Sequence, residues 1–143
     1  MLLRKFLDSV STQDLDLPDN TFDVITAIQA HHYLDFETRK MATCNCFRVL
    51  KNGGVYITFE NIKPLTAKGI EVGLQRWKNF QVGEGKPEDE ADRHMDRFGK
   101  EYFPITVIDH VKLLKGSDLV SLNCFGCHIY RQVFMQLMSK YCC

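Results

Sequence analysis

The chain has 143 residues, enough for one domain with a core of its own. Its 18 Lys and Arg residues balance 18 Asp and Glu residues, so neither a basic field for nucleic acid nor an acidic field for a cationic partner is expected. No apolar run approaches the roughly 20 residues that cross a membrane, and the first ten residues do not have the pattern of a signal peptide. Six cysteines without an export signal predict reduced thiols and a cytoplasmic location.

The first predicted element is a strand over residues 22–28, FDVITAI, which is short, apolar and rich in β-branched residues. This composition is typical of a strand that is covered on both faces. A helix should follow Asp35, its predicted N-cap, and end at NGG, residues 52–54, where the glycines can take the left-handed conformation. A second buried strand, residues 54–61, completes a βαβ unit. Such a unit implies a parallel pair with a right-handed crossover.

The middle of the chain has a different character. Residues 64–81 and 87–99 have the apolar periodicity of two amphipathic helices. We interpret residues 63–104 as a helical lid inserted over the sheet of a single domain, 1–143, because this segment is too short to build its own core.

The last part of the chain predicts a helix and a hairpin. The helix covers residues 105–116, with Thr106 as its N-cap. Two strands, residues 118–125 and 129–139, should then form an antiparallel hairpin with a tight turn at 126–128.

Polar side chains follow both strands of the βαβ unit. Gln29, His31 and His32 come just after the first strand, and Glu60 and Asn61 end the second. In open α/β sheets, ligands bind beyond the carboxyl ends of the parallel strands. The sequence therefore predicts a binding crevice at this edge. The alternative is that these groups cap the following helix or face solvent.

Two segments resemble a known family when taken in order. They are QDLDLPDNTFDVITAIQAHHYL, residues 13–34, and CFRVLKNGGVYITFE, residues 46–60. Together they resemble the second half of a class I S-adenosylmethionine-dependent methyltransferase of the small-molecule type. The resemblance implies an α/β fold: a partial Rossmann-like sheet with a helical lid insertion and a C-terminal antiparallel hairpin. It also implies S-adenosylmethionine as cofactor and a small-molecule methyl acceptor as partner.

The resemblance assigns roles to individual residues. Asp14 and Leu15 match the segment that contacts adenine, and Ile28 and Gln29 match positions that line the cofactor pocket. His31 and His32 match a histidine pair near the substrate entrance, where either could act as a general base. The candidate substrate contacts are Tyr33, Glu60, Arg76, Trp77, Arg97 and Tyr102. Packing or solvation is the alternative for the lid residues, and for Trp77 packing is favoured.

The sequence also departs from the family pattern. The glycine-rich turn that accompanies the first strand, and the acidic residue that holds the ribose, have no counterpart, because only about 13 residues precede the Asp14 segment. We therefore expect an N-terminally incomplete methyltransferase domain that cannot complete the cofactor site alone. The strand at residues 22–28 should then have an open edge, which favours a homo-oligomer formed through that edge. The alternative function is a non-catalytic, methyltransferase-like interaction module.

A cysteine cluster offers two further interpretations. CFGCH, residues 124–128, fits the c-type haem attachment pattern, which requires an oxidising compartment. Cys124, Cys127 and His128 could instead bind zinc together with Cys142 and Cys143, although adjacent cysteines rarely bind one ion. Neither interpretation is favoured, and no metal site is predicted.

Overall fold

The computed structural model describes residues 9–116, 119–125 and 133–140. Four strands and four α-helices are found there, with two short 3-10 helices before α1. In chain order the elements are η1 Thr12–Asp14, β1 Phe22–Ile28, η2 His31–Tyr33, α1 Phe36–Val49, β2 Leu50–Asn61, α2 Ala67–Gly83, α3 Glu88–Met95, α4 Val107–Lys115, β3 Leu119–Phe125 and β4 Val133–Lys140. No helix in these ranges is long and apolar enough to cross a membrane.

The four strands form one mixed sheet in the order β1-β2-β4-β3. β1 and β2 are parallel, whereas β4 runs antiparallel to both β2 and β3. The predicted βαβ unit and C-terminal antiparallel pair are therefore confirmed. The tight turn expected at residues 126–128 lies outside the described residues.

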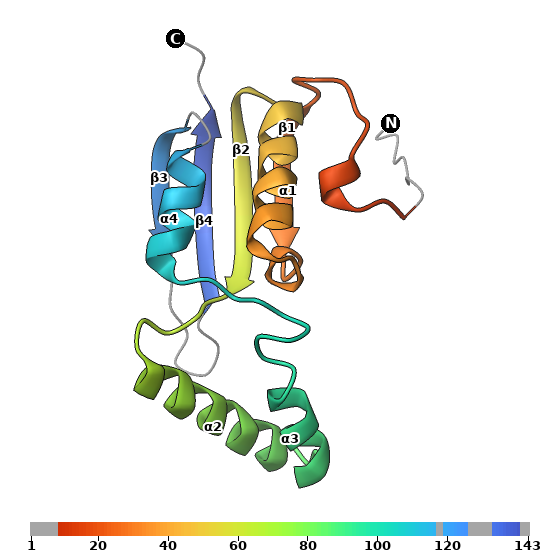
Figure 1. Cartoon of the computed structure of the whole chain (residues 1–143). Helices are drawn as coiled ribbons and strands as arrows, with labels where there is room; N and C mark the ends of the chain where they lie inside the picture. The colour runs from red at the N-terminus through yellow and green to blue at the C-terminus, as the bar shows by residue number, and fades with distance from the viewer. Residues whose placement is uncertain (1–8, 117–118, 126–132, 141–143) are drawn as a thin grey trace.

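The helices occupy two places around the sheet. Figure 1 shows α1 and α4 packed on the same face, whereas α2 and α3 lie beyond the ends at which β1 and β2 finish. The core under α1 and α4 is formed by Ala27, Cys46, Phe47, Leu50, Tyr56 and Leu114, with Ile25 packed beside it. Two predicted N-caps are confirmed: the Asp35 carboxylate accepts from the Thr38 amide at 2.8 Å, and the Thr106 hydroxyl accepts from the Asp109 amide at 3.1 Å.

The interpretation of NGG as a helix end is wrong. Helix α1 already ends at Val49, and the glycines lie in an irregular start of β2, where the register against β1 shifts. Gly53 has φ +76°, and a Cβ at Gly54 would lie 3.0 Å from the Asp23 carbonyl oxygen. The two glycines therefore serve a strand bulge and a close backbone approach to β1, rather than a cap.

The expectation that β1 is covered on both faces is also wrong. Ala27, on the face toward α1, is 6% exposed, whereas Val24 and Ile28, on the other face, are both 55% exposed. β1 also lies at the edge of the sheet and pairs only with β2 among the described strands. The apolar composition of β1 correctly indicated a strand, but its neighbours cover only one face.

Candidate functional site

A pocket of about 450 Å³ lies beyond the carboxyl ends of β1 and β2. One wall comes from the strand ends and the other from the lid, which we define as residues 63–104. Its size suits a small organic ligand. Of the residues predicted from the sequence, the pocket brings together Gln29, His32, Tyr33, Arg76, Trp77, Arg97 and Tyr102.

The other predicted site residues do not line this pocket. Asp14 is exposed on η1, which is held against α1 by the Asn45 side-chain amide through the carbonyls of Thr12 and Gln13. The Leu15 carbonyl accepts from Arg48 at 2.8 Å. Ile28 lies on the exposed face of β1.

Glu60 does not line the pocket, but it holds residues of its wall in place through hydrogen bonds. Its side chain is 1% exposed and accepts from the backbone amides of His31 at 3.1 Å and His32 at 3.0 Å. The His32 ring nitrogen Nδ1 lies 2.8 Å from the same carboxylate. Burial by itself raises the pKa of Glu60, but the hydrogen bonds from His32 and from the His31 amide outweigh it, so that the pKa is lowered. Glu60 is therefore an ionised carboxylate that fixes η2 and the His32 ring.

The two histidines have different surroundings. His32 lines the pocket, and with Nδ1 held by Glu60 its second nitrogen Nε2 lies 3.5 Å from the Asn61 side-chain amide. His31 instead directs its Nδ1 toward the Tyr56 hydroxyl at 3.4 Å, below the pocket. Burial lowers the pKa of His31, although Glu60 opposes this effect. Of the predicted pair, only His32 can present a ring nitrogen to a ligand in this pocket.

Arg39 is a buried residue that the sequence reasoning missed. It is 1% exposed and donates to the carbonyls of His31 at 2.9 Å and Phe103 at 2.7 Å. Burial lowers its pKa, and the Glu60 charge opposes that shift. Arg39 thereby joins the strand-end segment to the chain that leads out of the lid. No signal in the sequence pointed to it, because an arginine in an amphipathic helix usually faces solvent.

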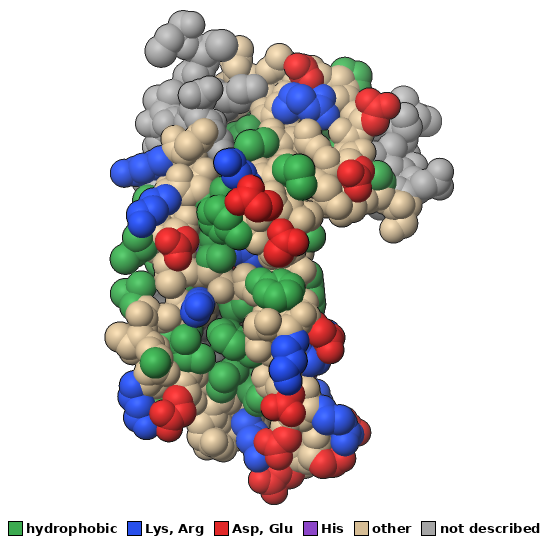
Figure 2. Space-filling view, in the orientation of Figure 1, with side chains coloured by type: hydrophobic (Ala, Val, Ile, Leu, Met, Phe, Trp, Pro, Cys, Tyr) green, Lys and Arg blue, Asp and Glu red, His purple; other side chains and the backbone are tan. Residues whose placement is uncertain are grey.

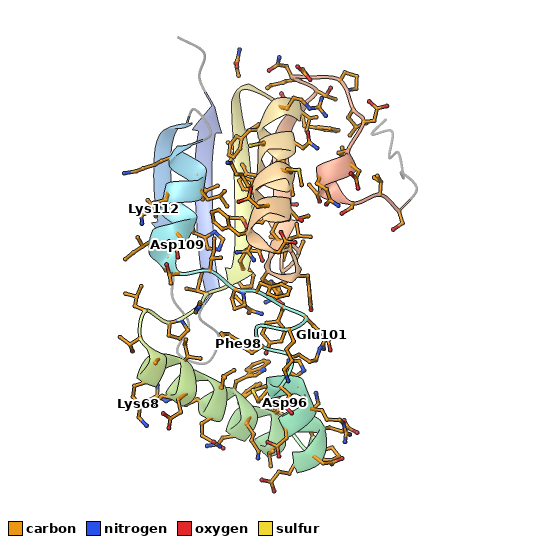
Figure 3. The ribbon with its side chains drawn as sticks, viewed as in Figure 1. Lys68, Asp96, Phe98, Glu101, Asp109 and Lys112 are labelled. Atoms are coloured by element: carbon orange, nitrogen blue, oxygen red, sulfur yellow. The ribbon has the colours of Figure 1, made fainter. Side chains whose placement is uncertain are left out.

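The lid wall of the pocket is largely aromatic. Trp77 stacks on Phe80, with ring centroids 5.6 Å apart and planes 15° apart, so the packing expected for Trp77 and its position in the pocket are both observed. Phe98 and Tyr102 meet edge to face at 5.8 Å. Figure 3 shows Phe98 in the space between α2 and the end of the sheet.

Asn61, His94 and Phe98 are among the lining residues that the sequence reasoning missed. A signal was available for His94, because it precedes Arg97, a residue that was selected, by three residues within the helix predicted over residues 87–99; in the structure α3 ends at Met95 and Arg97 follows it. Asn61 was recognised at a strand end but not assigned to the site. Phe98 lies within the apolar periodicity of residues 87–99, which predicts a helix but not a site residue.

Gln29 places a buried donor without a described partner at the end of β1. It follows the last residue of β1, has φ +50°, and lines the pocket. Its side-chain nitrogen Nε2 is buried and has no hydrogen-bond partner in the described structure. A buried donor without a partner costs stability unless a ligand accepts from it. Gln29 therefore fits a polar ligand such as a nucleoside at this end of β1.

The cysteine-based interpretations lie mostly outside the described residues, which exclude Cys127, His128, Cys142 and Cys143. Within the described ranges, no group of three or more His, Cys, Asp or Glu residues is arranged to hold a metal ion. Cys46 is buried, and burial raises its thiol pKa to about 12, which makes it an inert packing group. Cys44, two residues earlier on the same helix, is exposed and does not pack in the core.

Comparison with known families places this geometry in context. Residues 5–58 match the family model of a methyltransferase domain. Similar solved structures include a SAM-dependent methyltransferase from Thermotoga maritima, described as a possible histamine N-methyltransferase, with 14% identity and a TM-score of 0.59 over 94% of this chain. The chain has the class I methyltransferase fold. The family resemblance of the sequence, and the α/β Rossmann-like sheet expected from it, are thereby confirmed.

Two further structures show how widely this methyltransferase fold is used. The YcgJ protein from Bacillus subtilis is 17% identical, with a TM-score of 0.54 over 80% of this chain. The [4+2]-cyclase SpnF is 14% identical, with a TM-score of 0.58 over 94% of this chain. The chain spans 64%, 41% and 56% of the Thermotoga protein, YcgJ and SpnF, respectively. No curated protein matches the sequence. Because a cyclase shares the fold, the fold alone does not fix the reaction.

Proposed function

We propose that this protein is part of a methyltransferase. The enzyme would transfer the methyl group of S-adenosylmethionine to a small molecule bound in the 450 Å³ pocket. The observation that carries the proposal is the Glu60–His32 pair. It holds one ring nitrogen of a histidine and leaves the other for a ligand at the carboxyl end of parallel strands. The cytoplasmic location expected from the sequence is part of the same proposal.

The cofactor contacts would come from residues at and before β1. Gln29 would donate its buried side-chain N–H to the cofactor, with Ile28 beside it, and Asp14 and Leu15 would contact the adenine. When bound, S-adenosylmethionine supplies an electrophilic methyl group that an oxygen or nitrogen atom can attack. These residues would form one part of such a site.

The acceptor would be positioned and deprotonated by this chain's own residues. Glu60 accepts from Nδ1–H of His32, which makes Nε2 the basic nitrogen; its only described contact is the long one of 3.5 Å to the Asn61 side-chain amide, which an acceptor hydroxyl or amine would replace before Nε2 takes its proton. Asn61 lies beside Nε2 and restricts the ring further. The aromatic lid excludes water and holds the acceptor close to the strand ends.

Calorimetric titration with S-adenosylhomocysteine is the first test. Saturable binding that is weakened by Gln29→Leu supports the cofactor site. Absence of binding together with self-association through the exposed edge strand β1 favours the non-catalytic interaction module, for which that edge would be the contact surface.

The role of His32 has its own test. In protein that methylates a panel of small acceptors, detected by mass spectrometry, His32→Gln should lower turnover by about 10²–10⁴-fold, the usual contribution of a general base. His31→Gln should have a much smaller effect, because His31 does not line the pocket. Equal losses in both variants would remove the proposed role of His32.

A further inference from the structure

The charged groups of the pocket are of one sign. Its described lining contains two arginines, Arg76 and Arg97, and two histidines, but no aspartate or glutamate. The chain as a whole has a formal net charge of zero. The cationic lining is therefore a local property of the pocket, and it favours an anionic ligand.

The two arginines differ in whether the guanidinium group already forms an ion pair with a described residue. Arg97 donates from Nε to the Glu101 carboxylate at 2.6 Å, four residues further along the chain. Arg76, on α2, makes no ion pair with any residue that the structure describes, whereas other cations of the lid helices do: Lys68 pairs with Glu71, and Lys78 with Glu88 and Asp92. Arg76 therefore offers its guanidinium to a ligand without first breaking an ion pair.

The rest of the lid wall determines the shape that fits. Trp77 is next to Arg76 in the chain, and the rings of Trp77, His94 and Tyr102 follow one another, with centroids 6.2 Å apart at each step. Figure 2 shows hydrophobic side chains gathered between the end of the sheet and the two lid helices, whereas charged side chains cover the outside of α3. Aromatic side chains favour planar ligands, which can stack on them or meet their edges.

The two ends of the pocket have different chemistry. His32 and Asn61 come from the strand ends, whereas Arg76 comes from the lid helix α2. A ligand that contacts both walls would therefore place its anionic group at Arg76 and its reacting atom at His32. A carboxylate suits the anionic end, because its two oxygens match the guanidinium fork.

We propose, on the basis of the function proposed above, that the methyl acceptor is a planar aromatic carboxylic acid that places its carboxylate at Arg76 and its ring against Trp77 and Tyr102. Its hydroxyl or amine, at the opposite end of the ring, then lies at His32. The acid group contributes to binding and orientation and takes no part in the proton transfer. Arg76 is thus the residue that selects acids over neutral molecules.

The test is direct because Trp77 is the only tryptophan in the sequence, so its fluorescence reports occupancy of the pocket. The probes are 4-hydroxybenzoate, its neutral methyl ester, and cyclohexanecarboxylate, an acid without a planar ring. We expect 4-hydroxybenzoate to bind about tenfold more tightly than either of the other two, as one charge-assisted contact permits. The preference over the neutral ester should fall as salt is raised, because Arg76 is exposed at the edge of the pocket, whereas the preference over cyclohexanecarboxylate, which carries the same charge, should not.

Two matched variants test whether the carboxylate contacts Arg76. Arg76→Gln should weaken binding of 4-hydroxybenzoate about tenfold and so abolish the preference for the acid over the ester. Arg93→Gln, on the outer surface of α3 where Arg93 pairs with Asp89, should leave the preference intact. The proposal is overturned if the ester binds as tightly as the acid, if Arg76→Gln keeps the preference, or if none of the probes alters the fluorescence.

This binding experiment needs no cofactor, so its outcome is separate from that of the proposed function. Acid-selective binding without methyl transfer would retain the ligand class and remove the enzyme activity. Methyl transfer to neutral molecules with no acid preference would retain the activity and overturn the assignment of Arg76.

Discussion

The two faces of the sheet differ although the same strands form both. On the face covered by α1 and α4, Tyr56 and Glu60 of β2 are each 1% exposed. On the opposite face, Val24 and Ile28 of β1 are each 55% exposed, and no helix among the described residues covers them (Figure 1). Residues that alternate along a strand therefore have opposite surroundings.

The difference shows what each face can do. A carboxylate on the covered face is held in one geometry by buried donors and keeps its charge through those contacts, as at Glu60. An apolar residue on the open face contributes little to the core and remains available to another polypeptide. The covered face can therefore hold charged side chains in a fixed geometry, whereas the open face and the edge of β1 can associate with another polypeptide.

The largest effect that would test this comparison is expected at Glu60. Glu60→Gln removes the negative charge that offsets the positive charge of buried Arg39. It also leaves the backbone amides of His31 and His32 without two carboxylate acceptors. Together these losses should lower the free energy of unfolding by about 3–5 kcal/mol. Urea denaturation measures it. Glu71→Gln is the matched control, because Glu71 is exposed on α2 and, among the residues that the structure describes, pairs only with Lys68; it should cost less than about 1 kcal/mol. A Glu60 variant as stable as this control would mean that the buried network does not stabilise the covered face.

The covered face should also make stability depend on pH. The pKa of His110 is lowered from 6.5 to about 4, mainly by burial and also by Arg39 and His31, while Glu60 and Asp109 oppose the shift. Because the folded-state pKa lies below the unfolded value, the unfolded chain binds more protons between pH 6.5 and 4, and stability falls as pH falls through this window. The loss should reach about 3 kcal/mol, from 1.36 kcal/mol per pKa unit.

Denaturation at a series of pH values, with His110→Gln beside the unaltered protein, measures this loss. The variant should have a flatter profile between pH 6.5 and 4. The lowered pKa values of His31 and Glu60 act in the same direction, so some acid sensitivity should persist in the variant. A profile that is unchanged by the substitution would assign the acid sensitivity to other groups.

The smallest effect on stability, but the clearest on association, is expected on the open face. We propose that a second copy of the chain associates through the edge of β1, as the sequence reasoning anticipated. Val24→Lys should alter the unfolding free energy by less than about 1 kcal/mol, because Val24 is largely exposed. It should also shift the protein toward monomer, because a charged residue on an edge strand opposes pairing.

Small-angle scattering over a concentration series measures the oligomeric state. Lys68→Gln, far from β1 on α2, serves as the control and should leave association unchanged. A monodisperse monomer in the unaltered protein would contradict the association through β1.

Much of the fold could be predicted from the sequence because its signals are local. The apolar run at residues 22–28, the N-caps Asp35 and Thr106, and the periodicity of the lid helices each gave the right kind of element in the right order. The position of the site was also predictable, because a parallel βαβ unit places both strand ends at one edge. Gln29, His32 and five lid or strand-end residues were selected on that basis and do line one pocket.

The tertiary structure decided what local signals could not. The sequence could not separate His31 from His32, because the difference depends on Glu60 approaching one ring from a strand 28 residues further along the chain. It could not show that Arg39 is buried, that NGG forms a bulge against Asp23, or that one face of β1 is open. Burial and long-range hydrogen bonds depend on which elements pack together, whereas strand and helix formation depend mainly on neighbours in the chain.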